Sequence, residues 1–330
     1  ISYLLITLFF CGLLTFSFHK NLSTIRGFTH IFYNPPSLTK DHATNILMLD
    51  RMRLEILEME RQNQDWLLPR FGLDHSLKMV ERLKEHFSDL FRVGILNPLD
   101  TILINRAKKV NRNTPEDEFV DYVGYAVVRI TILREYLKGR KIVLKEEFKT
   151  IASNLLGGLN TGINREIASR LGEIYYVYLR WNKDKVDFRQ RLEFFRSTLI
   201  DLLNRKGGDL RWLVKKWIPE APDIHLNNFW GISEIGAAWG KVVVPSAYTE
   251  EGRKHIKDFI TLIEDALEDK KFLSKFQRRK VEFWRWYEKQ FYYTWNSFIR
   301  RFNEAIARIE DISTWHSLAS VMNTEQNPYF

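Results

Sequence analysis

The chain opens with the uncharged apolar run ISYLLITLFFCGLLTFSF, residues 1–18. About 18 such residues can cross a hydrocarbon core of roughly 30 Å as a helix, because a helix satisfies its own backbone hydrogen bonds. Large apolar residues occur all round the helical wheel and leave no polar stripe, which disfavours the buried core helix of a soluble protein. The run therefore predicts a transmembrane helix, with membrane lipid around residues 1–18.

A secretory signal peptide is the competing interpretation of this run. Such a leader needs an initiator Met, a basic leader segment and a small-residue cleavage site. The chain instead begins at Ile1, and Phe16-Ser17-Phe18-His19-Lys20 contains no Ala-x-Ala pattern. We therefore expect a transmembrane helix within a longer protein. Lys20 and Arg26 favour a cytoplasmic location for the residues beyond the run, but the positive-inside rule compares two flanks and only one is present.

Composition indicates that the remainder is a folded, mainly helical protein. The chain is 45% hydrophobic, 14% aromatic and 28% charged, with only 9 Pro and 16 Gly among 330 residues. Single cores stop growing near about 250 residues, so the length predicts two soluble domains. The one cysteine, Cys11, lies in the apolar run, which excludes disulfides and cysteine-based metal sites from the soluble part.

The chain carries 50 Lys and Arg against 41 Asp and Glu, a formal net charge of +9. Nucleic acid, anionic lipid or an acidic protein could each be the partner of such a chain. The charge is dispersed, however, and the densest clusters, Lys138–Lys141 and Gln277–Lys280, are short and fall at expected helix ends. Cations there complement the helix dipole or remain solvated, so we expect no nucleic-acid partner.

Hydrophobic periodicity divides the soluble part into three segments. Residues 19–41 carry turn signals that culminate in Asn34-Pro35-Pro36-Ser37 and predict a linker. Residues 42–205 contain successive amphipathic helices with short loops, which is typical of a helical bundle, with breaks at Gly157-Gly158 and Gly162. Residues 206–330 form a second, mostly helical domain.

The second domain combines a short strand with a long aromatic helix. Lys241-Val242-Val243-Val244-Pro245 is the clearest β-branched run, and Thr249 then caps a helix. Within residues 281–310, aromatic and aliphatic residues recur every three or four positions and form one stripe. Burial of each large side chain contributes roughly 1.5 to 3 kcal/mol of stability, so we expect this stripe to form core rather than a ligand site. The stripe consists of Trp284, Tyr287, Phe291, Trp295, Phe298, Phe302, Ile306 and Ile309. Trp295, at its middle, should be enclosed by a neighbouring helix.

The sequence contains no recognisable catalytic constellation. Gly157–Asn164 has the glycines of a phosphate-binding loop but lacks its Lys-Ser/Thr pair. No H-E-x-x-H or G-x-S-x-G motif occurs, the eight histidines lack metal-ligand spacing, and the adjacent pairs Glu146-Glu147 and Glu250-Glu251 point to different helix faces. We therefore expect a protein without enzymatic activity, cofactor or metal.

Five stretches, in order along most of the chain, resemble the conserved segments of one family. Asn45–Leu54 resembles an "L..LD.LR" helix, and Phe71–Asp74 a "GLY" turn with Asp for Tyr. Val242–Gly252 resembles an "aFT..G" segment with Tyr for Phe, Tyr292–Phe298 a "Y...W...L" helix and Asn327–Phe330 a closing "sP" element. These are the segments of the IcmF/TssM family, the large inner-membrane subunits of type VI and Dot/Icm type IVB secretion systems. The choice between the two systems stays open, with Dot/Icm favoured.

The resemblance implies a structural subunit of a transenvelope complex. It places the chain from Asn21 onward in the periplasm, against the weak indication from Lys20 and Arg26. It also implies a nucleotide-binding-like cytoplasmic domain upstream of Ile1 and a DotU- or TssL-like membrane protein as partner.

The leading hypothesis is therefore a membrane-anchored scaffold that self-associates around a secretion channel. A membrane-bound enzyme would instead need polar groups that converge in a pocket, and a nucleic-acid or lipid-surface binder would need its basic residues on one face. Candidate contacts between copies are the basic residues near helix ends, with solvated charge as the alternative: Arg278, Arg279, Lys280, Arg300 and Arg301.

Overall fold

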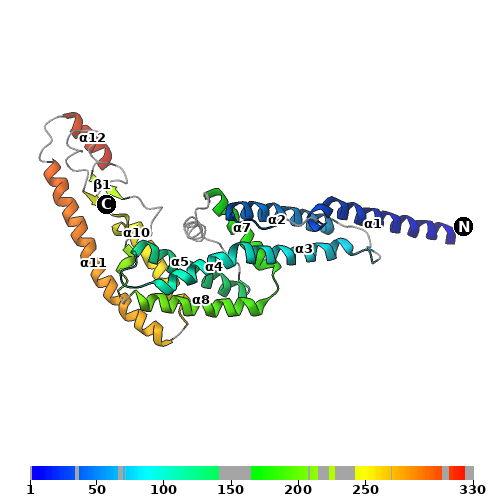
Figure 1. Ribbon diagram of the computed structural model, residues 1–330. Helices are drawn as coiled ribbons and strands as arrows, with labels where there is room; N and C mark the ends of the chain where they lie inside the picture. Colours follow the sequence, from blue (N-terminus) through cyan, green and yellow to red (C-terminus); the bar gives the residue numbers. More distant parts are fainter. Residues whose placement is uncertain are drawn as a thin grey trace. The chain divides into compact units, whose positions relative to one another are not determined.

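The computed structural model describes residues 2–33, 37–65, 70, 72–140, 165–206, 209–214, 223–226, 242–268, 270–306 and 312–323. This part of the chain is mainly α-helical, with one small two-stranded sheet and a long apolar helix at its start (Figure 1). The expected fold class is thereby confirmed. The predicted breaks at Gly157, Gly158 and Gly162, most of residues 206–240 and the closing Asn327–Phe330 lie outside the described residues.

Helix α1, Ser2–Tyr33, is longer than the sequence predicted. It runs without interruption through residues 19–33, so the expected linker over 19–41 is wrong for this stretch. The reason is that Ser17, Asn21, Thr24, Phe28 and Ile31 recur every three or four residues and are all buried against the following helices. Their polar members resemble turn residues in the sequence, but they lie in a packed helix face.

The first compact unit comprises Ile1–Lys109 and Gly124–Thr198. Helix α2, His42–Gln64, packs against α1, against α3, His75–Phe91, and against α7, Arg165–Trp181. Asp41 caps α2 by accepting hydrogen bonds from the backbone N–H groups of Ala43 and Thr44. Helix α3 continues through a π-helical turn, η1 at Arg92–Leu96, into α4, Asn97–Lys109.

The second compact unit comprises Val110–Val123 and Leu199–Phe330. Two helices, α5 at Glu116–Leu137 and α8 at Lys185–Arg205, therefore contribute residues to both units. This division differs from the expected boundary at residue 205, because 110–123 and 199–205 belong to the second unit. Phe119 of α5, for example, packs edge-on against Trp212, with ring centroids 5.1 Å apart. The sequence shows no sign of these boundaries, because α5 and α8 run through them without a change of composition.

Two short strands, two 3₁₀ turns and three helices make up the rest of the second unit as far as the structure describes it. Strand β1, Ile224–His225, pairs antiparallel with β2, Val243–Val244, so the strand predicted at 241–245 is present at its centre. A 3₁₀ turn, η4 at Ser246–Tyr248, leads to α10, Glu250–Ala266, where Thr249 accepts a hydrogen bond from the N–H of Gly252 as predicted. Another 3₁₀ turn, η2, spans Arg211–Val214, and α11 and α12 span Lys270–Ile306 and Ile312–Met322.

The aromatic stripe lies on α11, and three of its members form core as expected, while Trp284, Phe291 and Trp295 are half-buried. Tyr287, Phe298 and Phe302 are buried, and the last two pack with Leu226, Val244 and Leu318 beneath the sheet. The Tyr287 hydroxyl donates a 2.6 Å hydrogen bond to the carbonyl of Ala247.

Trp295 is less enclosed than predicted. Its ring is half-buried, and its indole N–H donates a 2.8 Å hydrogen bond to the carbonyl of Tyr248, in the η4 turn. The turn therefore supplies the polar cover that a neighbouring helix was expected to give. Ile309, the last member of the stripe, lies outside the described residues.

Truncation of Phe298, which is only 1% exposed, should destabilise the second unit. We expect Phe298→Ala to lower the free energy of unfolding by about 3 to 5 kcal/mol, because it removes buried apolar area and leaves a cavity. Tyr293→Ala, five residues earlier on α11, is the matched control: its side chain is 72% exposed and the change should stay within about 0.5 kcal/mol. Denaturant unfolding of the full chain in detergent measures both; equal losses would contradict the assignment of the stripe to the core.

Candidate functional site

The first half of α1 presents an exposed apolar surface. Ten large side chains between Tyr3 and Phe18 are each 44% to 88% exposed. Among the described residues, one helical span, Ser2–Ile31, is long and apolar enough to cross a membrane, and only 6% of its apolar 18-residue window is buried. A core helix of that composition would be mostly buried, so this exposure argues against the core-helix alternative.

Polar contacts attach the second half of α1 to the body. The Lys20 ammonium donates a 3.1 Å hydrogen bond to the carbonyl of Asp65, at the end of α2. The side-chain oxygen of Asn21 accepts a 3.2 Å hydrogen bond from the N–H of Ser76, in the first turn of α3. Since the α3 N-cap residue Asp74 makes no side-chain capping bond, Asn21 supplies this cap from another helix. We call these contacts the α1 joint.

The five candidate interface residues do not form one cluster. Arg279 donates to the carbonyl of Leu203 at 3.3 Å and burial lowers its pKa, while Lys280 pairs with Glu264 at 2.7 Å. Both therefore stabilise the second unit. Arg278, Arg300 and Arg301 are exposed, and Arg301 pairs locally with Glu304 at 3.0 Å.

Distance also separates the exposed members of this set. Arg278 and Arg300 lie about 33 Å apart along the axis of α11. Of the five predicted residues, the structure thus leaves Arg278, Arg300 and Arg301 at the surface, at separate places on one helix.

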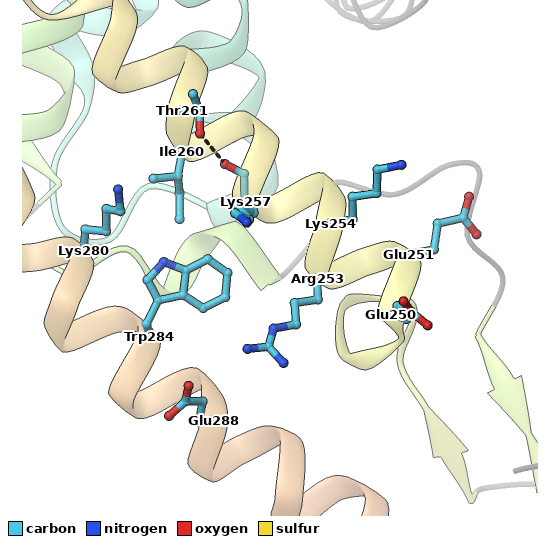
Figure 2. A pocket seen from close by; sticks show the side chains of 10 residues that line it. All are labelled: Glu250, Glu251, Arg253, Lys254, Lys257, Ile260, Thr261, Lys280, Trp284 and Glu288. Atoms are coloured by element: carbon cyan, nitrogen blue, oxygen red, sulfur yellow. Dashed lines mark hydrogen bonds between the residues drawn. The ribbon is translucent and has the colours of Figure 1, made fainter. Parts of the chain in front are cut away.

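A groove of about 1070 Å³ runs between α10 and α11 (Figure 2). Arg253 of α10 lies over the ring of Trp284 of α11, with its guanidinium carbon 6.0 Å from the ring centroid. The groove is lined by charged side chains of both signs, by Thr261 and by two apolar residues: Glu250, Glu251, Arg253, Lys254, Lys257, Ile260, Thr261, Lys280, Trp284 and Glu288. Three glutamates stand against one arginine and three lysines, so the lining does not present a strong field of one sign to a ligand.

The sequence predicted that the side chains of Glu250 and Glu251 point to different helix faces. Both line the groove, although the helix rotates their side chains in different directions (Figure 2). Glu146 and Glu147, the other acidic pair, lie outside the described residues.

A buried ionic network in the first unit was missed by the sequence analysis. Asp100 of α4 accepts hydrogen bonds from Tyr125 at 2.8 Å, from Arg129 at 3.2 Å and from Arg191 at 3.0 Å. Arg129 is 1% exposed, and its guanidinium lies 4.8 Å from the ring centroid of Phe195. The signal was available: Arg129 interrupts the apolar stretch 125–132 of a predicted helix.

Burial controls the protonation of this network. Desolvation raises the pKa of Tyr175, which accepts a hydrogen bond from Arg129, to about 12, so the phenol stays neutral at physiological pH. The pKa of Arg129 is also raised, by the charge of Asp100, although burial alone acts in the opposite direction. The charged guanidinium of Arg129 lies among aromatic rings and is hydrogen-bonded to the Asp100 carboxylate. This arrangement is suited to holding α4, α5, α7 and α8 together.

Among the residues that the structure describes, no group of three or more His, Cys, Asp or Glu side chains is arranged to hold a metal ion. Comparisons with protein-family models, curated proteins and solved structures found no match to this chain.

Removal of the Asp100 carboxylate should destabilise the first unit. Asp100→Ala leaves Arg129 buried without its countercharge, and we expect a loss of about 3 to 5 kcal/mol in the free energy of unfolding. Glu193→Ala breaks a 2.6 Å ion pair with Arg196 in which Glu193 is 69% exposed, and should cost no more than about 1 kcal/mol. Unfolding curves of the full-length variants decide the matter. If Asp100→Ala behaved like the control, the network would not hold the helices together.

Proposed function

We propose that this chain is a structural scaffold subunit of a transenvelope protein secretion complex, anchored in the bacterial inner membrane by α1. Its helical body lies in the periplasm, associates with further copies and binds a DotU/TssL-like membrane protein. The observation that carries the proposal is the continuity of α1, which is apolar and exposed up to Phe18 and then builds part of the folded body.

This continuity favours a permanent anchor over a removable leader. Asn21 caps α3, and Phe28 and Ile31 are 8% and 4% exposed, so the body depends on turns that follow the apolar run without a break. Cleavage after the apolar run would remove Ser17, which is fully buried at the start of this packed face.

The positions of the family-like motifs agree with the proposal. The stretch 45–54 lies on α2, next to α3 and α7, and Gly72 precedes α3 with φ of 80°, a left-handed conformation that favours glycine. The stretch 242–252 contains β2, η4 and the start of α10, and 292–298 lies on α11, where Trp295 contacts η4. These four stretches thus fall where elements meet, as expected of residues that specify a fold; the fifth, Asn327–Phe330, lies outside the described residues.

Two rival functions receive less support. A nucleic-acid or lipid-surface binder needs a continuous basic face, but the exposed arginines of α11 are spread along it and Arg301 is paired. An enzyme needs a pocket with convergent polar groups, whereas the α10/α11 groove is lined by mixed, solvated charges. We therefore propose that the chain acts by association and not by catalysis.

Alkaline phosphatase fused after Phe330 should be active in intact cells, because the enzyme folds only where its disulfides form and the proposal places the body in the periplasm. A fluorescent protein that matures only in the cytoplasm, fused at the same position, should be dark. The reverse pair of results would overturn the proposed orientation.

Charge reversal at exposed arginines should weaken assembly without loss of fold. We expect the double variant Arg278→Glu/Arg300→Glu to keep the unfolding transition of the parent but to form fewer or smaller complexes in detergent, and to reduce secretion. Lys280→Glu is the contrasting variant: it faces Glu264 at 2.7 Å with a like charge and should destabilise the second unit itself. Complexes of unchanged size in the double variant would contradict these contacts.

A further inference from the structure

Helix α11 carries most of the excess positive charge of the chain. Among its 37 residues, ten are lysine or arginine and three are glutamate, which gives the helix a formal net charge of +7. The whole chain carries +9. The charge is therefore less dispersed than the short sequence clusters suggested, and a helix of this charge attracts acidic groups.

One side of α11 points away from the core of the second unit. Tyr287 and Phe298 are buried, and at about 100° per residue they define the inner side of the helix. Figure 1 shows α11 along one edge of the unit, with α10 and the two strands beside it. Five exposed side chains lie on the other side, and we call them the outer face of α11: Arg285, Lys289, Tyr292, Tyr293 and Asn296.

The outer face combines free positive charge with exposed aromatic rings. Arg285 and Lys289 make no ion pair with any residue that the structure describes. Tyr292 and Tyr293 are each 72% exposed. Tyrosine and arginine are enriched where proteins bind one another, because they supply a large contact area and a polar group on the same side chain. The outer face thus offers both charge attraction and apolar area to a protein partner.

The spacing of the outer face fits a second helix. Four of its residues follow one another at intervals of four, three and four positions, the spacing of a seam along which two helices pack: Arg285, Lys289, Tyr292 and Asn296. About 17 Å without a basic residue separates Lys289 from Arg300, so the bases do not form the continuous track that follows a nucleic-acid backbone. Two copies of α11 would repel each other, since both are strongly basic.

We propose that the outer face of α11 docks an acidic helix of a partner protein. Tyr292 and Tyr293 are the central anchors, and Arg285 and Lys289 pair with carboxylates of the partner. The partner is a chain different from this one. The inference goes beyond the scaffold function proposed above, because it depends neither on the membrane anchor nor on a secretion complex.

Site-specific photocrosslinking of the full chain in cells of its native host tests this docking face. The crosslinking amino acid p-benzoylphenylalanine replaces Tyr293 or, as the control, Val186 of α8, which is 61% exposed. We expect the residue at 293 to join the chain to another protein through a helical segment rich in Asp and Glu, identified by mass spectrometry of the crosslinked peptides. The residue at 186 should not give this product.

Charge variants in the Tyr293 crosslinking background separate electrostatic docking from mere proximity. We expect Arg285→Glu/Lys289→Glu to lower the yield of the product by about tenfold or more, because like charges across an interface repel. Glu282→Lys is the matched control: Glu282 is exposed on the same side of α11, and the added positive charge should keep or raise the yield. All three positions are exposed, so each variant should unfold at the temperature of the parent.

Absence of a crosslinked product at 293, or equal yields in all variants, would overturn the docking face. A product with a second copy of this chain would also overturn it, and would favour the self-association proposed above. A crosslink within one copy would assign the outer face to another segment of the same chain, and a product that nuclease removes would assign it to nucleic acid; either result contradicts the inference.

Discussion

Helix α1 links the apolar run to the folded body. Its continuity reflects one constraint: in lipid a chain must satisfy its own backbone hydrogen bonds, which a helix does. Residues 2–18 expose apolar side chains all round, so in lipid they require a helix, and nothing in the sequence before Asn34 ends that helix. The packed seam from Ser17 to Ile31 therefore continues the direction of the apolar run. Helices α2 and α3 pack against α1.

Buried polar groups then specify how the helices meet. Asn21 completes the first turn of α3 from another helix, and Asp100 collects hydrogen bonds from Tyr125, Arg129 and Arg191. Such groups stabilise little in net terms, since desolvation offsets much of their attraction, but a misaligned arrangement would leave them unpaired. In the second unit, Tyr287 and Trp295 play the same part by bonding the η4 backbone. The apolar seams supply the driving force, and these bonds select one alignment.

Periodicity predicted most of the architecture, because it reports which face of an element is buried. It located the helical bundle within residues 42–205, the buried aromatic residues of α11 and the strand at Val243–Val244. It failed where burial depends on a partner distant in sequence: Asn21 and Thr24 look like linker residues until α3 lies beside them. The same limit applies to the candidate interface, since nothing local to Arg279 or Lys280 indicates that Leu203 and Glu264 bind them. The Arg129 network required four helices to be brought together.

Electron cryo-microscopy of the full chain in lipid nanodiscs would show whether one uninterrupted helix joins the membrane to a scaffold body. We expect continuous density for α1 from the bilayer through residue 33, a first unit with one fixed tilt, and copies arranged around a closed ring. A break in the helix near Lys20, with single bodies in many orientations above the bilayer, would contradict both the continuous anchor and the scaffold.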